Sequence, residues 1–136
     1  MTRATVEHEV LIASCAISAG IHAALAPEHF RDEPGAGVGF LVSAVLLGVL
    51  CVVLVYRPAS RIAVGAAGAT LAGLLVAYAL VLAVGVPVLH PDPEPADGLA
   101  LVTKAIELVG LVAALGLGAP GLLAGRFTRP LPKGTR

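Results

Sequence analysis

The sequence predicts an all-α integral membrane protein, a bundle of four membrane-spanning helices. Of its 136 residues, 57% are hydrophobic and only 13% are charged, whereas a soluble domain is about half apolar and about a quarter charged. The mean hydropathy is +0.93. Four long apolar segments each approach or exceed the ~20 residues that a helix needs to cross ~30 Å of hydrocarbon. Lipid offers no partner for unpaired backbone groups, and the alternation typical of strands is absent, so each span is predicted to be helical.

The first predicted helix covers residues 8–26 and ends at Pro27, which breaks a helical pattern. A cleaved signal peptide is the alternative interpretation, because Ala24-Leu25-Ala26 has the small-x-small pattern of a cleavage site. However, Pro27 would follow the cut, and Glu7 and Glu9 make the region before the apolar stretch acidic. We therefore expect a retained helix.

The other three helices are predicted at 38–56, 62–88 and 98–118. The third is longer than a span requires, so we expect it to tilt, or to break near Gly85-Val86-Pro87. Asp97 offers an N-cap for the fourth helix. Residues 1–119 form the predicted membrane domain, and residues 120–136 form a basic tail that is expected to be disordered or to lie on the lipid surface.

The distribution of charge predicts the orientation of the bundle. Seven of the nine basic residues fall on one side of the predicted spans: Arg3, Arg57, Arg61, Arg126, Arg129, Lys133 and Arg136. Loop cations concentrate on the cytoplasmic side of membrane proteins. We therefore expect an up-down-up-down bundle in the cytoplasmic membrane, with both termini inside and residues 27–37 and 89–98 outside. The preference for Arg over Lys and the abundance of Ala and Gly suggest a bacterial source.

Small residues recur at intervals of four on two of the predicted helices, a spacing that lets helix backbones approach closely in lipid. The residues are Gly65, Ala69, Gly73 and Ala77 on the third helix, and Gly110 and Ala114 on the fourth. These stripes are predicted to pack helices, either within one bundle or between this chain and a partner. The spacing alone does not distinguish a homo-oligomer from another membrane protein as that partner.

Polar residues are predicted to form one layer in the outer half of the bundle. At 1.5 Å per residue, residues from all four helices reach similar depths below the outer face. They are Ser18, His22, Ser43, Tyr78, Lys104 and Glu107. Lys104 and Glu107 are three apart and therefore able to touch. An isolated charge at the bilayer centre costs at least about 2.5–3.5 kcal/mol on insertion scales, which points to a protein-facing position.

This layer has two interpretations. In the structural one, Lys104 and Glu107 pair with each other and the hydroxyls bond helix carbonyls. In the functional one, the layer forms the floor of a pocket open to the outside.

Histidines and carboxylates near the outer face form a second candidate site, for a metal. Imidazole with carboxylate suits zinc or copper, and the candidate ligands are His22, Glu28, His29 and His90. They lack a compact His-x-x-His spacing, so the interpretation as surface residues or helix caps is preferred and no cofactor is expected.

Several functions are disfavoured by what the sequence lacks. It has no Gly-rich phosphate loop, no G-x-S-x-G motif and no His-Glu-x-x-His motif, so no enzymatic activity is expected. The formal net charge of zero disfavours nucleic-acid binding. Two hypotheses remain: a non-enzymatic accessory or assembly protein, which we favour at this point, and an outward-facing binding or transport module for a metal ion, a proton or a small solute.

Overall fold

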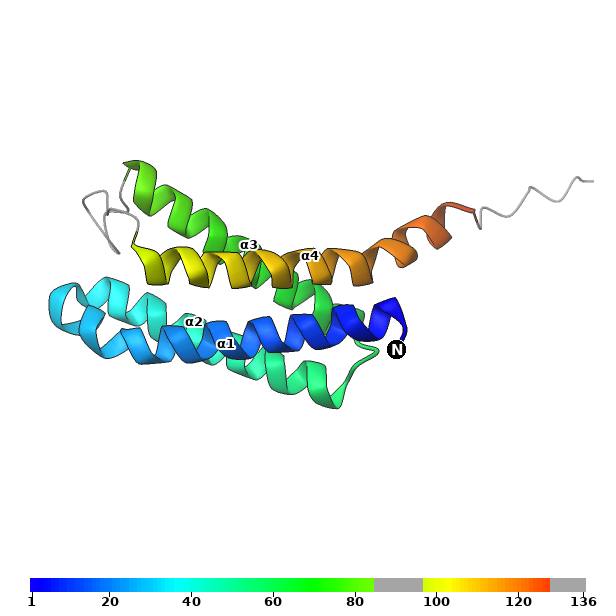
Figure 1. Ribbon diagram of the computed structural model, residues 1–136, viewed down its shortest axis with the longest axis horizontal. Helices are drawn as coiled ribbons and strands as arrows, with labels where there is room; N and C mark the ends of the chain where they lie inside the picture. The colour runs from blue at the N-terminus through cyan, green and yellow to red at the C-terminus, as the bar shows by residue number, and fades with distance from the viewer. Residues whose placement is uncertain (85–96, 128–136) are drawn as a thin grey trace, which may run out of the picture.

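The computed structural model describes residues 1–84 and 97–127, with side chains described as far as 118. Within these ranges all regular structure is helical (Figure 1). The helices are α1 (Arg3–Asp32), α2 (Pro34–Tyr56), α3 (Arg61–Val84) and α4 (Gly98–Phe127). The predicted all-α class, with four helices, is confirmed.

Each helix is long enough and apolar enough to cross a membrane, with the apolar part of α4 running from Gly98 to Gly118. The outward faces are apolar as well. On α2, for example, Val42, Val45, Val49 and Val52 are each more than half exposed. An apolar surface of this extent is unusual on a protein that faces water. The structure therefore has the features of a small membrane protein.

The helix ends follow from local capping. The Thr2 side chain accepts a hydrogen bond from the Thr5 amide at the start of α1, and Ser60 accepts one from the Ala63 amide at the start of α3. Asp97 accepts a hydrogen bond of 2.7 Å from the Ala100 amide, so it is the N-cap of α4 that the sequence predicts.

Predicted boundaries differ from those in the structure at the α1–α2 connection and at the end of the chain, and α1 begins at Arg3 rather than at residue 8. Pro27 lies inside α1, which continues to Asp32, and only Glu33 separates α1 from α2. The expected loop at 27–37 is therefore largely helical. A proline removes a single backbone hydrogen bond. The helix is held before Pro27 by the buried residues His22 and Ala26, and after it by His29, whose ring stacks on Phe40 of α2.

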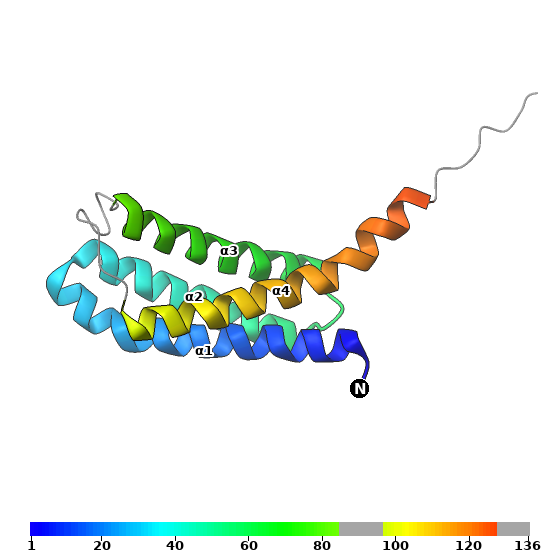
Figure 2. The same ribbon diagram turned by 45° about the horizontal axis from the view of Figure 1, so that its top comes forward.

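The second difference lies at the end of the chain. The helix α4 continues past Gly118 and Pro120 to Phe127 and extends beyond the other helices (Figure 2). The first part of the predicted tail, 120–127, is therefore helical. The predicted break at Gly85-Val86-Pro87 and residues 128–136 lie outside the described part of the chain.

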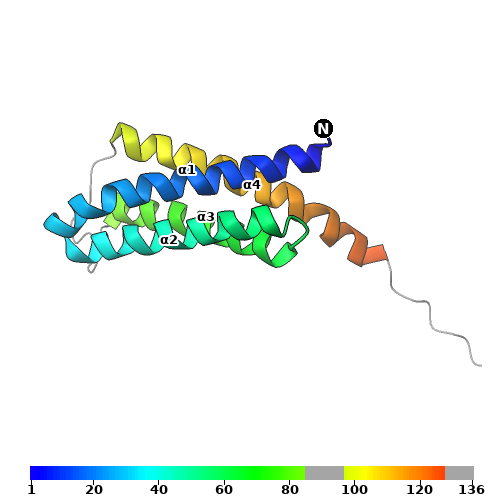
Figure 3. The same cartoon turned by 90° about the horizontal axis from the view of Figure 1, so that it is seen from below.

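The packing is centred on α1 and α4. The helix α1 lies along both α2 and α4, α3 packs against α4, and α2 meets α3 over a smaller area (Figures 1 and 3). Buried apolar residues from several helices form the core, among them Leu11, Leu47, Leu54 and Leu71. The N-terminus and the α2–α3 connection lie at one end of the molecule. The α1–α2 turn and the start of α4 lie at the other, which we call the turn end (Figure 1).

The small-residue stripes occupy different environments. On α4, Gly110 and Ala114 are inside the bundle, and Ala114 packs against Gly68 of α3. On α3, Gly65 and Gly73 have no heavy atom within 4 Å of the place where a Cβ would be, and Ala69 is exposed. Among the described residues, the stripe on α4 is thus used for packing within this chain, whereas on α3 Gly65, Ala69 and Gly73 are open and Ala77 lines a cavity. The helix α3 instead buries Ala63, Ala67, Gly68 and Leu71.

The tight α1–α2 turn depends on a glycine. A Cβ added to Gly37 would lie 2.5 Å from Phe30 Cγ and 2.7 Å from Phe30 Cα, so the backbone would have to move. We expect Gly37→Ala to lower the free energy of unfolding by about 1–3 kcal/mol, the usual cost of overpacking. Thermal unfolding in detergent, followed by circular dichroism, measures this.

The matched control is Gly48→Ala on the same helix, where a Cβ meets nothing within 4 Å. Alanine is favoured over glycine in a helix, so this variant should unfold at the wild-type temperature or slightly above it. Equal behaviour of the two variants would contradict the role assigned to Gly37.

Candidate functional site

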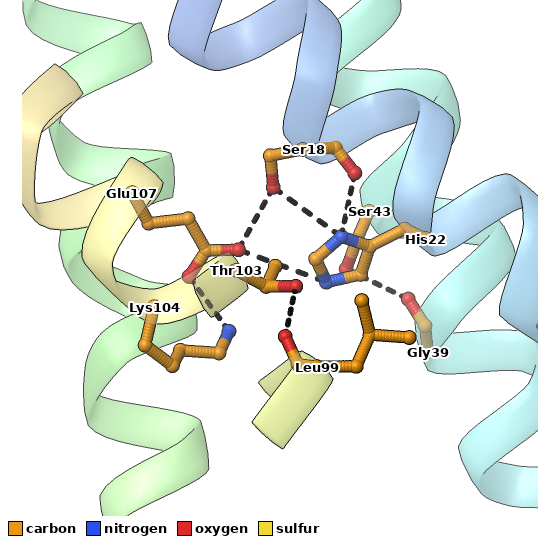
Figure 4. Close-up of polar contacts among 8 residues, drawn as sticks. All are labelled: Ser18, His22, Gly39, Ser43, Leu99, Thr103, Lys104 and Glu107. Atoms are coloured by element: carbon orange, nitrogen blue, oxygen red, sulfur yellow. Dashed lines mark hydrogen bonds and ion pairs between the residues drawn. The ribbon is translucent and has the colours of Figure 1, made fainter. Parts of the chain in front are cut away.

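A buried carboxylate, Glu107 of α4, organises the polar groups in the half of the bundle nearest the turn end. Its side chain is completely inaccessible to solvent. The Ser18 hydroxyl donates a hydrogen bond of 2.8 Å to Glu107 Oε1, and Lys104 Nζ donates one of 2.6 Å to Oε2 (Figure 4). Both carboxylate oxygens are thus satisfied, one across the α1–α4 interface and one within α4.

The orientation of His22 is fixed by its own helix. Its Nδ1 lies 2.8 Å from the Ser18 carbonyl oxygen. Because a carbonyl can only accept, Nδ1 must carry the hydrogen. In the neutral imidazole Nε2 then bears a lone pair, and this atom is turned toward α4, 3.9 Å from Glu107 Oε1 (Figure 4).

Lys104 is a partly buried cation that contacts Glu107 and Tyr78. Its side chain is 16% exposed, and its ammonium nitrogen lies 5.4 Å from the centre of the Tyr78 ring. That distance is within the range of cation–π attraction. The Glu107 carboxylate and the Tyr78 ring together replace part of the hydration that Lys104 loses on burial.

Two further hydroxyls lie beside this network without joining it. Ser43 donates to the Gly39 carbonyl oxygen at 2.7 Å, and Thr103 donates to the Leu99 carbonyl oxygen at 2.8 Å (Figure 4). Bonds to the preceding turn of the same helix are a common solution for hydroxyls in apolar helices. Thr103 is not among the residues predicted from the sequence, although its place four residues before Glu107 puts both on one face of α4.

A cavity of about 530 Å³ lies beside the network toward the turn end and is lined by all four helices. Each helix contributes a polar side chain to it: His22 from α1, Ser43 from α2, Tyr78 from α3 and Lys104 from α4. Volumes of ~300–1,000 Å³ are typical of small-molecule sites. The predicted polar layer is therefore arranged around a space, and Ser18 and Glu107 support it from behind.

An aromatic ring of α2 lies against two histidines of α1, His22 and His29. The Phe40 ring stacks on His29, with 4.0 Å between the ring centres, and lies 5.2 Å from His22. His29 Nδ1 also donates to the Leu25 carbonyl oxygen at 3.0 Å. Both imidazoles line the cavity, but each is held by its own helix and by the Phe40 ring between them.

The predicted metal ligands are distributed around the same cavity. His22, Glu28 and His29 line it, whereas His90 lies outside the described residues. Among the residues that the structure describes, no three His, Cys, Asp or Glu side chains are grouped as metal ligands. The expectation of no cofactor, with zinc or copper binding as the less favoured alternative, stays a prediction from the sequence.

The fold and the site define a four-helix membrane-type bundle with a buried ionic network beside a polar cavity. Comparisons with protein-family models, with curated proteins and with solved structures find no match to this chain. Its function is therefore argued from the chemistry of the site.

Proposed function

We propose that the protein is a small multi-pass protein of the cytoplasmic membrane whose cavity opens to the outside and binds a small solute. The hypothesis of a binding module is therefore preferred to that of an accessory protein, which the sequence alone favours. One observation carries it: the buried network of Glu107, Lys104, His22 and Ser18 lies directly beside a cavity of about 530 Å³. No catalytic step is assigned to the site.

The energetics of burial support a function for the network. Apolar side chains of similar volume often stabilise a fold as well as a buried ion pair does, or better. Charged residues within membrane spans are expensive and are characteristic of ligand or ion pathways. A solute in the cavity would contact Lys104 and His22, which both line it, so the network is placed where it is able to serve a ligand.

The charge distribution supports the proposed orientation. Arg57 and Arg61 flank the α2–α3 connection, and Arg3 begins α1 at the same end of the molecule (Figure 1). With this end in the cytoplasm, the helices follow the up-down-up-down course with both termini inside. The cavity then faces the exterior.

A second candidate function rests on the unused stripe of α3. Gly65 and Gly73 present open backbone to the surroundings, and small residues of this kind allow close packing with a helix of another chain. An accessory or assembly role would use this face, either in a homo-oligomer or against another membrane protein.

Cysteine accessibility tests the proposed function. In a background with Cys15→Ala and Cys51→Ala, Ser43→Cys places a thiol on the cavity wall. We expect a membrane-impermeant methanethiosulfonate added outside intact cells to label it at least about tenfold faster than Val42→Cys, which faces away from the bundle and is 58% exposed. The physical reason is that the reaction needs a thiolate, which requires water.

The comparison is matched because residues 42 and 43 lie at nearly the same depth. Labelling of Ser43→Cys that is as slow as that of Val42→Cys would contradict a hydrated cavity. Labelling only from the cytoplasmic side, in inverted vesicles, would contradict the outward orientation.

A further inference from the structure

We propose that the ligand of the cavity is a small primary ammonium ion carrying a short apolar chain. This inference rests on the proposed function and adds the chemical class of the solute. Three features of the cavity carry it: the sign of its charge, a buried acceptor atom at its floor, and the character of its walls.

The charged groups around the cavity favour a cation. Its lining includes the carboxylates of Glu28, Asp32 and Asp97, and Lys104 is the basic residue among the described lining residues. The charge of Lys104 is already balanced by Glu107 at 2.6 Å. Apart from this balanced pair, the Asp, Glu, Lys and Arg side chains of the described lining are acidic, and a low-dielectric cleft with one sign of charge attracts ions of the opposite sign.

The acceptor is His22 Nε2. His22 is 5% exposed and lines the cavity, and its Nδ1 hydrogen is committed to the Ser18 carbonyl oxygen. Nε2 lies 3.9 Å from Glu107 Oε1, which is too far for a hydrogen bond. In the neutral imidazole the Nε2 lone pair is therefore able to accept a hydrogen bond from a donor in the cavity. A primary ammonium supplies one.

The walls accommodate the rest of such a molecule. Ile21, Leu25, Leu74 and Val81 line the cavity and are apolar, so they suit a short hydrocarbon chain. An anion would gain from Lys104 but would have to pass the three carboxylates, so the cation is favoured.

Calorimetric titration of the full chain in phosphatidylcholine nanodiscs tests the inference, with empty nanodiscs correcting for partition into lipid. The probes are n-hexylammonium, hexyltrimethylammonium, hexanoate and hexanol. We expect n-hexylammonium to bind at least about tenfold more tightly than hexanoate or hexanol. Ala77→Phe, in the cavity lining, should abolish this binding, whereas Ala79→Phe, on the exposed face of α3, should preserve it.

Two variants separate the acceptor from the charge. His22→Leu should weaken the binding of n-hexylammonium about tenfold, as expected for loss of one hydrogen bond to a charged group. The same variant should bind hexyltrimethylammonium, which has no N–H, with an affinity within about twofold of wild type. The double variant Glu28→Gln/Asp32→Asn alters only exposed side chains. It should lower the affinity for both cations and reduce the salt dependence of their binding.

The outcomes distinguish this inference from the proposed function. If hexanoate or hexanol binds as tightly as n-hexylammonium and Ala77→Phe abolishes that binding, the cavity takes solutes but the ammonium assignment is wrong. If no probe shows binding that Ala77→Phe removes, the ammonium assignment is also overturned. The labelling of Ser43→Cys then decides the proposed function independently.

Discussion

Replacing Glu107 with leucine is expected to lower the free energy of unfolding by about 3–5 kcal/mol, the cost of breaking a buried ion pair from one side. The variant leaves the Lys104 ammonium, with a side chain only 16% exposed, without its carboxylate. It also removes the acceptor of the Ser18 hydroxyl. Because Lys104 retains some access to solvent and the Tyr78 ring, the lower end of the range is expected. Denaturation by sodium dodecyl sulfate in mixed micelles, followed by circular dichroism, measures the loss.

The double variant Lys104→Met/Glu107→Leu is the decisive control. It removes both charges together, and replacing an ion pair by apolar side chains of similar volume is often neutral or stabilising. We expect it to recover most of the stability that Glu107→Leu loses. Glu107→Gln keeps an acceptor for Ser18 but not the negative charge, so its loss should lie between those of the other two variants.

This series also separates structure from function. If Lys104→Met/Glu107→Leu unfolds like wild type but no longer binds n-hexylammonium, the ion pair serves the ligand site. If Glu107→Leu alone unfolds like wild type, the network does not hold α1 against α4, and the energetic argument for Glu107 is wrong.

The sequence predicts the fold class and the depth of the polar layer because both depend on distances along single helices. The length of an apolar run decides whether it is able to span a bilayer. A constant rise of 1.5 Å per residue places His22 and Lys104 at similar depths without any knowledge of packing. The contact between Lys104 and Glu107, now seen at 2.6 Å, likewise requires only a spacing of three.

Contacts between helices depend on how each helix is rotated about its own axis, which the spacing of residues along a single helix does not determine. The hydrogen bond from Ser18 to Glu107 joins residues 89 apart in sequence and requires that α1 and α4 turn these faces toward each other. The same limit explains why the packing face of α3 was not predicted. Two sets of residues on this helix repeat at intervals of four: an exposed set that includes Gly65 and Gly73, and a buried set that includes Ala67 and Leu71. Composition does not distinguish the two faces when lipid and core are equally apolar.

The close packing of α4 against its neighbours leads to the second large prediction, for Gly110→Leu. A Cβ at this position would lie 2.6 Å from Ser14 Cβ and 2.9 Å from Leu71 Cδ1, so α1 would be pushed away from α4 and the Leu71 side chain would have to move. Overpacking usually costs about 1–3 kcal/mol. Because leucine adds three further carbons beyond this Cβ, we expect a loss of about 3 kcal/mol in the same denaturation assay.

The matched variant is Gly73→Leu, where a Cβ meets nothing within 4 Å. We expect it to change the stability of the isolated chain by no more than about 0.5 kcal/mol, as for other exposed positions. If Gly110→Leu unfolds like Gly73→Leu, the close approach of α1 and α3 at Gly110 is contradicted. Gly73→Leu could instead lower the stability only at protein concentrations where the chain associates. That result would place the α3 stripe in an interface between chains. Gly110→Leu thus tests whether the α4 stripe packs inside the bundle, and Gly73→Leu tests whether the α3 stripe packs against another chain.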